Sequence, residues 1–345
     1  MSSPLGKFYD FERIELAITP TPIEYLANIT KALNGPQIYV KRDDLTGLAL
    51  GGNKARQLEF YMGQAQAHGA DTVLTTGAVQ SNMVRTTAAA AAKMGFECHL
   101  QLEERVSSNQ DAYKNSGNVL LNRLFGATIY SFSTGEDELA ADKNLVKISK
   151  RLMENGRKPY VISLSPGHPP YGALGYIVCA MEILDQISRR TLTIDEIICA
   201  SGSASTHAGL VFGLRALGSK IKVTGICVRR NSDLQKPRVL KKCWEIGSLL
   251  EINQPVSVED VITSDASFYP GYGQLNKQTL EALKLCASLE GLVLDPVYTA
   301  KAFAGLINCI KNNKYNKEQN ILFIHTGGQP GLFAYEPQLR DLIAV

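Results

Sequence analysis

A lysine that follows two glycines is the first residue of this sequence with a recognisable chemistry. Lys54 ends the run Gly51-Gly52-Asn53-Lys54, between a candidate strand and a candidate helix. Paired glycines let the backbone turn sharply and approach a ligand closely. A lysine on the first turn of a helix faces the positive end of the helix dipole, and with partial burial its pKa falls, which makes the free amine a better nucleophile. The alternative is an ordinary solvated lysine on the helix surface.

A second segment has the composition of a phosphate-binding loop. Small and hydroxyl-bearing residues run from Ala200 to His207, directly after the apolar run 196–199. Such a loop between a buried strand and a helix leaves backbone N–H groups free for an anion, and serine and threonine hydroxyls add donors. The G-x-G-x-x-G spacing of dinucleotide-binding proteins is missing. The alternative is a tight turn that binds nothing.

Two further junctions between strand and helix carry polar residues. Ser81 and Asn82 precede an alanine-rich helix, where they cap it or help its N–H groups to hold a carboxylate or phosphate. The segment 325–328, His-Thr-Gly-Gly, follows another buried strand. A reactive lysine and a phosphate cradle on separate loops are what pyridoxal phosphate requires, and a generic phosphate-bearing ligand is the alternative.

These loops are positioned by strands that alternate with helices. Short apolar, β-rich runs predict strands at 38–42, 72–76, 97–102, 127–130, 160–164, 196–200, 222–228 and 321–325. Helical periodicity predicts helices at 54–67, 82–93, 118–125, 138–155, 173–188, 205–217, 277–290 and 300–312. The alternation indicates βαβ units and parallel sheets covered by helices on both faces, with ligands at the carboxyl ends of the strands.

The domain organisation rests on two turn-rich stretches, at 46–53 and 165–172. They predict a large domain made of residues 1–55 plus 165–345, and a smaller inserted α/β domain at 56–164. With 345 residues, the chain has the length expected for two modest domains or one large one.

Composition narrows the class of protein. The formal net charge of +3 is too even to indicate a nucleic-acid or membrane-surface partner, and the apolar runs are shorter than a membrane span. The first residues lack the pattern of a signal peptide. The 7 cysteines and 5 histidines have no metal-ligand or disulfide spacing. We therefore expect a cytoplasmic protein with free thiols and no metal site.

Taken together, the residues resemble the pyridoxal-phosphate enzymes of the tryptophan-synthase-β fold, fold type II. More narrowly, the chain is similar to the family of D-cysteine desulfhydrase and 1-aminocyclopropane-1-carboxylate deaminase. The resemblance runs from about Thr19 to Tyr335. It rests on the motifs Lys41-Arg42-Asp43-Asp44, Gly51-Gly52-Asn53-Lys54, Gln80-Ser81-Asn82, Leu294-Asp295-Pro296-Val297-Tyr298 and His325-Thr326-Gly327-Gly328. It implies two open, mainly parallel sheets flanked by helices, the cofactor in the cleft between domains, and a homodimer.

The resemblance also implies roles for individual residues. Lys54 carries the cofactor on its amine, Asn82 meets the ring hydroxyl, and Ser81 with its helix N–H groups receives the substrate carboxylate. Tyr272 and Tyr298 face the reacting side of the substrate. The implied phosphate-binding residues are Gly202, Ser203, Ala204, Ser205 and Thr206, and the implied substrate-binding residues are Ser81, Asn82, Met83, Tyr272 and Tyr298.

Two threonines separate the branches of this family. The deaminases carry Glu directly after the tyrosine equivalent to Tyr298 and Leu after the histidine equivalent to His325, whereas this chain has Thr299 and Thr326, the desulfhydrase pattern. A carboxylate beside the ring nitrogen would keep it protonated. A neutral hydroxyl leaves it unprotonated, which suffices for eliminating a good leaving group such as thiolate. Which threonine contacts the nitrogen stays open at this point.

Three residues depart from the family pattern. Met83 stands where His or Gln is usual, Thr86 stands where Gln is usual, and Ala204 replaces a common glycine of the phosphate loop. Met83 is next to the implied carboxylate site, so it bears on the choice of amino acid. The methyl group of Ala204 narrows the loop without removing its N–H donors.

The resemblance therefore implies a carbon–sulfur lyase that converts D-cysteine to pyruvate, hydrogen sulfide and ammonia. In that reaction Lys54 takes the α-proton, and Tyr298 or Tyr272 assists the leaving group. The alternatives are elimination on L-cysteate, β-chloroalanine or diaminopropionate, the cyclopropane deaminase, and a pyridoxal-phosphate-binding protein without turnover.

Overall fold

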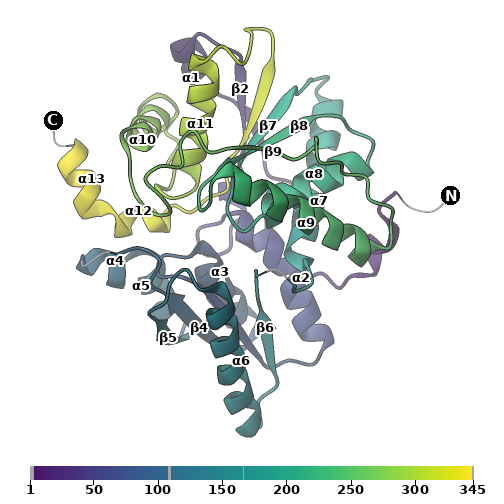
Figure 1. Ribbon diagram of the computed structural model, residues 1–345, viewed down its shortest axis with the longest axis vertical. Helices are drawn as coiled ribbons and strands as arrows, with labels where there is room; N and C mark the ends of the chain where they lie inside the picture. The colour runs from purple at the N-terminus through teal and green to yellow at the C-terminus, as the bar shows by residue number, and fades with distance from the viewer. Residues whose placement is uncertain (1–3, 108–109, 166, 344–345) are drawn as a thin grey trace.

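The strands of the protein form two separate sheets, in a computed structural model that describes residues 4–107, 110–165 and 167–343 (Figure 1). The six-stranded sheet has the order β1-β2-β10-β7-β8-β9, and the four-stranded sheet has the order β5-β4-β3-β6. Only the pairing of β1 with β2 is antiparallel among the described strand pairs. The strands are β1 (Ile23–Tyr25), β2 (Gln37–Lys41), β3 (Thr72–Ala78), β4 (Glu97–Glu103), β5 (Thr128–Phe132), β6 (Pro159–Ile162), β7 (Glu196–Ser201), β8 (Lys222–Cys227), β9 (Ile262–Ser264) and β10 (Asn320–Ile324).

The larger sheet buries both of its faces. Successive strand residues point to opposite faces, so the apolar run of β10 divides between two cores. Leu322 packs into the core formed with α7, α8 and α9, while Phe323 packs into the core formed with α10 and α11 on the other side. These helices are α7 (Tyr171–Arg189), α8 (Ser205–Ala216), α9 (Ser232–Leu250), α10 (Lys277–Glu290) and α11 (Thr299–Lys311).

The smaller sheet is covered in the same way. One face packs on α2 (Asn53–Ala67) and the alanine-rich α3 (Asn82–Met94), and the other packs on α6 (Glu138–Glu154) through Leu145 and Ile148. Helix α2 also packs extensively against α7, so it lies between the two sheets. The remaining helices are α1 (Ala27–Leu33), α4 (Asp111–Asn115), α5 (Gly117–Leu124), α12 (Pro330–Ala334) and α13 (Glu336–Ile343).

The eight strands and eight helices expected from the sequence are all present, with ends displaced by a few residues. The long helix α9 is not predicted from the sequence, where Pro237 signals a helix break. The helix persists because Val239, Cys243, Ile246 and Leu250 form a continuous buried stripe against the core. The edge strands β1 and β9 are not predicted either, because strands of three residues are too short to have a periodic pattern.

Residues 55 and 165 stay predicted domain boundaries, since the structure assigns strands to sheets and leaves α2 in contact with both units. None of the helices in the described ranges is long and apolar enough to cross a bilayer.

Candidate active site

A single pocket collects most of the residues expected at the site. It lies where loops at the carboxyl ends of strands from both sheets meet, as the switch-point rule for α/β sheets requires. The expected residues that line it are Lys54, Ser81, Asn82, Met83, Gly202, Ser203, Ala204, Thr206, Tyr272, Tyr298 and Thr326. Ser205 and Thr299 are expected site residues that the lining does not include.

Lys54 enters this pocket from the first turn of α2. The turn before it is tight: Gly51 has φ +67°, and a Cβ on it would lie 2.0 Å from the carbonyl oxygen of Asp44. The Lys54 ammonium donates to Gln57 Oε1 at 3.1 Å. Burial lowers the pKa of Lys54 to about 8, which confirms the expected depression. Near neutral pH, a larger fraction of Lys54 is therefore the free amine than of an ordinary lysine.

Two of the charged residues at 41–44, Lys41 and Asp43, lie in a buried network of ion pairs. Asp43 accepts from both Nε (3.0 Å) and Nη2 (2.9 Å) of Arg56. Glu182 of α7 accepts from Arg56 Nη1 at 2.7 Å and from Lys41 Nζ at 3.0 Å. This network, Lys41, Asp43, Arg56 and Glu182, fixes the start of α2 to β2 and α7.

The start of α8 presents free donors to the pocket. Among the residues that the structure describes, no side chain caps this helix, so the first N–H groups of α8 have no intrahelical or capping partner there. The hydroxyl of Thr206 accepts from Asn53 Nδ2 at 2.9 Å and from Gln57 Nε2 at 3.0 Å. With both lone pairs used, its own O–H is left to donate. The loop thus offers several donors to an anion.

Ala204 explains why glycine suits this loop. Its φ of +80° places it in the left-handed region, which L-residues with a Cβ adopt at a cost of about 1–2 kcal/mol. The departure noted in the sequence therefore strains the backbone, in addition to narrowing the loop.

Replacing Ala204 by glycine is expected to raise the free energy of unfolding by about 1 kcal/mol, because the strain is relieved while the unfolded chain gains some entropy. Chemical denaturation measures this change in the free energy of unfolding. Ala216→Gly, at the end of the same helix, is the matched control and should lower stability instead. A destabilised Ala204→Gly variant would contradict the interpretation.

Ser81 and Asn82 occupy the start of α3 as expected. Ser81 Oγ accepts the N–H of Val84 at 3.3 Å, so it caps the helix loosely. Asn82 Oδ1 accepts from Asn118 Nδ2 at 3.0 Å, which leaves the Asn82 amide nitrogen as the end available to a ligand. Met83 is 2% exposed and packs in the core beneath α3 while its edge reaches the pocket wall.

Tyr272 and Tyr298 form a hydroxyl pair on the pocket wall, with 2.6 Å between the two oxygens. The backbone of Tyr298 is fixed by Asp295, which accepts its N–H at 3.0 Å. The loop of Tyr272 is fixed by Lys301, which donates to the carbonyls of Phe268 and Gly271. Burial raises the pKa of both tyrosines, so both keep their protons at neutral pH.

The two threonines differ in position. The hydroxyl of Thr299 donates to Asp295 Oδ1 at 2.7 Å, inside the buried start of α11 and away from the pocket. Thr326, in contrast, lines the pocket, and its carbonyl accepts the N–H of Asn53 at 3.0 Å. Of the two, only Thr326 is placed to meet a ring in the pocket.

Five charged residues of the pocket lining are not among those expected from the sequence. These are Glu103, Arg105, Glu138, Arg229 and Arg238. Glu103 is the last residue of β4, and Arg105 and Arg229 come two residues after β4 and β8. The same switch-point rule could therefore have found these three residues.

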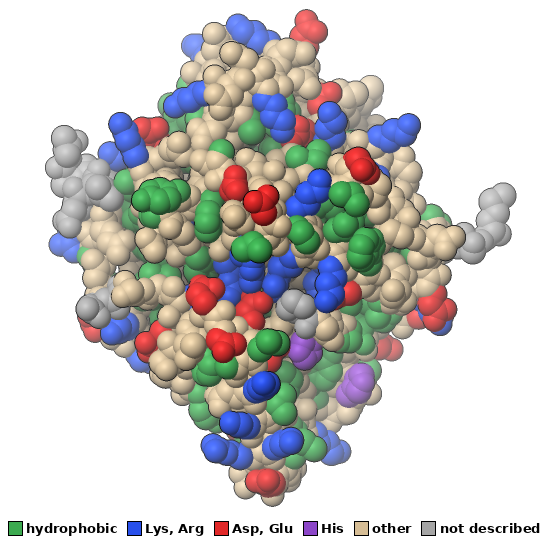
Figure 2. Space-filling model, in the orientation of Figure 1, with side chains coloured by type: hydrophobic (Ala, Val, Ile, Leu, Met, Phe, Trp, Pro, Cys, Tyr) green, Lys and Arg blue, Asp and Glu red, His purple; other side chains and the backbone are tan. Residues whose placement is uncertain are grey.

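Glu138 joins the two sheet units across the mouth of the pocket. As the first residue of α6, it contacts Arg229 Nη1 at 2.5 Å, Arg230 Nη2 at 2.6 Å and Arg238 Nη1 at 3.0 Å. Burial opposes ionisation of Glu138, but the three guanidinium groups outweigh it and lower its pKa to about 2. Figure 2 shows basic side chains gathered across the middle of this face, where the two units of Figure 1 meet.

The fold and this pocket define the class of protein. The model of the family described as pyridoxal-phosphate dependent enzyme matches residues 14–327, and the chain belongs to that family. The expected fold, type II with two mainly parallel sheets, is confirmed by this match and by the structural neighbour below.

Particular relatives are similar over nearly the whole chain. D-cysteine desulfhydrase of Salmonella choleraesuis (strain SC-B67) is 44% identical over 336 residues, which cover 97% of this chain and 100% of the relative. D-cysteine desulfhydrase of Salmonella enteritidis PT4 (strain P125109) has the same identity and coverage. A solved structure described as an ACC deaminase homologue superposes with a TM-score of 0.87 at 36% identity, over 99% of this chain and 100% of that one.

The residues present fit pyridoxal phosphate. Lys54 supplies an amine with a lowered pKa, the uncapped start of α8 and the Thr206 hydroxyl supply phosphate donors, and the Asn82 amide nitrogen is available to the ring hydroxyl.

Proposed function

We propose that the protein catalyses α,β-elimination on a small β-substituted amino acid, with D-cysteine converted to pyruvate, hydrogen sulfide and ammonia. The observation that carries this proposal is the placing of the Lys54 amine and the Tyr272–Tyr298 hydroxyl pair on one pocket. A base and a proton donor are what an elimination needs at the α-carbon and the leaving group. The relatives named D-cysteine desulfhydrase indicate the substrate.

Each residue has a role in this proposal. Ser81 and the N–H groups at the start of α3 bind the substrate carboxylate. Lys54 Nζ removes the α-proton, and one tyrosine hydroxyl donates a proton to the departing sulfur. Bound pyridoxal phosphate supplies the electron sink for the negative charge that develops on the α-carbon. One water enters overall, so that cysteine and water give pyruvate, ammonia and hydrogen sulfide.

Thr326 is the proposed partner of the cofactor's ring nitrogen, in place of Thr299. Its hydroxyl is neutral, whereas the nitrogen of a deaminase would face a carboxylate. This difference favours elimination of thiolate over opening of a cyclopropane ring.

Release of pyruvate and sulfide by the purified, cofactor-loaded protein tests the proposal. D-cysteine, L-cysteine and 1-aminocyclopropane-1-carboxylate are supplied in parallel. We expect sulfide and pyruvate in equal amounts from D-cysteine and no product from the cyclopropane. Absence of turnover with cysteine of either hand, while cofactor remains bound, would overturn it.

Substitution of each tyrosine by phenylalanine distinguishes the roles of Tyr272 and Tyr298. The tyrosine that donates the proton should lose about 10²-fold in kcat on D-cysteine when replaced by phenylalanine, and its partner less than about tenfold. β-Chloro-D-alanine, whose chloride leaves without a proton, should be affected little by either change. Tyr25→Phe, which alters an exposed hydroxyl on β1, is the control. Equal losses on both substrates would exclude a role in protonating the leaving group.

We further propose that the chain is a cytoplasmic homodimer. The seven cysteines are all free thiols, six of them buried, as suits a reducing compartment. Light scattering tests the assembly, since the chain mass is 37.6 kDa and a dimer has twice that mass.

A further inference from the structure

Arg105 is a charged group of the pocket that the proposed reaction does not yet use. It lies just beyond β4, and one edge of its guanidinium is occupied: Nε and Nη2 donate to Glu103 Oε2 at 2.9 and 2.7 Å. Nε also donates to the carbonyl of Gly135 at 3.1 Å. Its Nη1 has no hydrogen bond to the part of the chain that the structure describes, and the side chain is 12% exposed.

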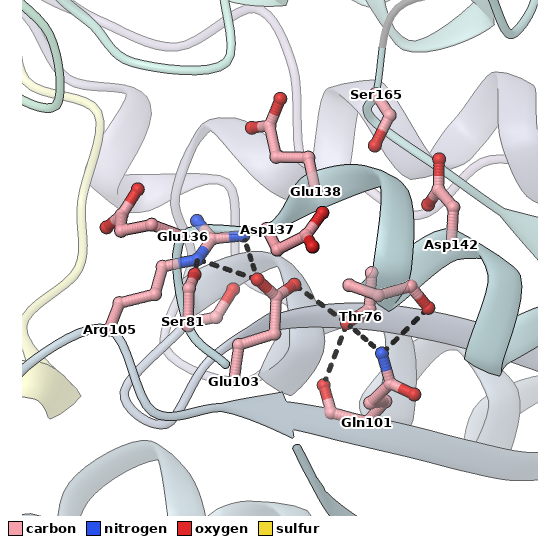
Figure 3. A network of polar contacts seen from close by, with 12 residues as sticks. Thr76, Ser81, Gln101, Glu103, Arg105, Glu136, Asp137, Glu138, Asp142 and Ser165 are labelled. Atoms are coloured by element: carbon pink, nitrogen blue, oxygen red, sulfur yellow. Dashed lines mark hydrogen bonds and ion pairs between the residues drawn. The ribbon is translucent and has the colours of Figure 1, made fainter. Parts of the chain in front are cut away.

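Glu103 is built to hold this arginine in place. It is 1% exposed, and its other oxygen accepts from the hydroxyl of Thr76 at 2.8 Å. Thr76 in turn accepts from Gln101 Nε2 at 3.0 Å (Figure 3). Each side chain in this series of hydrogen bonds is held by the next one, so the Arg105 guanidinium is oriented before a ligand binds.

The loop of Arg105 packs on the loop of the tyrosine pair. Val106 contacts the same small cluster as Tyr272 and Tyr298. Gly273 allows this contact, because a Cβ there would lie 2.5 Å from Val106 Cγ2. The charge of Arg105 opposes the effect of burial on both tyrosines and pulls their pKa values down. Arg105 therefore lines the same pocket as the two tyrosines and interacts with them electrostatically.

We propose that Arg105 binds a negatively charged β-substituent of the substrate, such as a thiolate or a sulfonate, and so selects amino acids that carry such a group. The inference rests on the proposed function. A largely buried guanidinium with a free N–H edge binds an oxyanion or thiolate strongly, and it offers nothing to an ammonium group. The α-carboxylate has its own site at Ser81 and the start of α3, which leaves Arg105 for the other end of the substrate.

Binding of an unreactive pair of acids to the cofactor-loaded protein gives a test that does not depend on turnover. 3-Sulfopropanoate and butanoate differ in carrying a sulfonate or a methyl group, and calorimetry measures both. We expect the sulfonate to bind at least about tenfold more tightly, a preference that falls below about threefold in Arg105→Gln. Arg189→Gln, which removes an exposed arginine of α7, should keep the preference.

No preference in the unmodified protein, or one that persists in Arg105→Gln, would overturn the proposal. Loss of the preference in Arg229→Gln instead would also overturn it, by assigning the anion to the mouth of the pocket.

Turnover separates this inference from the proposed function. In Arg105→Gln, we expect kcat/KM to fall at least about tenfold more for D-cysteate than for β-chloro-D-alanine, with partial recovery in Arg105→Lys. An equal fall for both substrates would mean that Arg105 binds the common α-carboxylate, which overturns the inference alone. No pyruvate from D-cysteine, D-cysteate or β-chloro-D-alanine with the unmodified protein would overturn the proposed function itself.

Discussion

Replacing Lys54 by methionine is expected to reduce pyruvate formation by about 10³-fold or more, because the variant loses both the attachment point of the cofactor and the base at the α-carbon. The yellow absorbance of the bound cofactor should disappear together with activity. Pyruvate assays and absorbance spectra measure the two effects. A variant that keeps either one would show that another amine carries the cofactor.

Chemical labelling of the unmodified, cofactor-loaded protein is the control for the Lys54→Met variant. Lys301 is also a largely buried lysine with a pKa lowered to about 8, but its ammonium is held by backbone carbonyls outside the pocket lining. Borohydride reduction of the loaded protein should therefore attach cofactor mass to the peptide containing Lys54 and leave the Lys301 peptide unlabelled.

The pH dependence of cofactor uptake follows from the same pKa. Only the free amine of Lys54 attacks an aldehyde, and its pKa of about 8 is below the ordinary lysine value. The rate of uptake by the cofactor-free protein should rise as pH increases through about 8 and level off above it. A rise centred near the ordinary value of about 10.4 would contradict burial of this amine.

Replacing Asp43 by asparagine is expected to lower the free energy of unfolding by about 3–5 kcal/mol, because it leaves a buried positive charge uncompensated. Lys41 and Arg56 face Asp43 and Glu182 in that network, so the change turns two charges of each sign into a net charge of +1. All of Asp43's side chain is buried, and Thr21 and Tyr176 also donate to it. Urea denaturation measures the loss.

The comparison for Asp43 is Asp185→Asn, which removes a carboxylate of α7 that pairs with Arg189 on the surface. Both partners are more than half exposed, so the change should cost less than about 1 kcal/mol. Similar losses for the two variants would mean that the buried network contributes no special stability.

The network also predicts how stability responds to acid. Burial opposes ionisation of Asp43, but Arg56 and Lys41 outweigh it and hold the pKa below its ordinary value. A carboxyl whose pKa is lower in the folded state stabilises the protein above its unfolded pKa. That contribution is lost as pH falls through the folded pKa. The asparagine variant should therefore lose less stability on acidification than the unmodified protein.

The sequence predicts the frame of this fold because its signals are local. The central strands β7 and β10 carry continuous apolar runs, and the glycines before Lys54 mark a turn whatever surrounds it. Pro237 shows the limit of such signals, since the buried stripe of α9 outweighs the local break that proline introduces. The three-residue strands β1 and β9 depend on pairing with their neighbours.

For the site, residue types predict candidates but not their partners. The sequence gives no reason to prefer Thr299 or Thr326 as the partner of the ring nitrogen. Only the folded structure shows that the hydroxyl of Thr299 is hydrogen-bonded to Asp295. Glu103 and Arg105 could be found from their place at the carboxyl end of β4, yet their fixed orientation depends on Thr76 of the neighbouring strand β3. Such contacts join residues distant in sequence, and no local pattern encodes them.

The ion pairs between Glu138 and three arginines have a consequence for how small molecules enter and leave the pocket. Figure 1 places α6 and the segment after β8 on different halves of the molecule. Any opening that separates these two segments must pull the Glu138 carboxylate away from the three guanidinium groups. Dissolved ions compensate separated charges and screen their attraction over about 10 Å at 0.1 M. Ionic strength should therefore affect the opening of the Glu138 bridge more than the reaction inside the pocket. Added salt should speed the entry and release of small molecules.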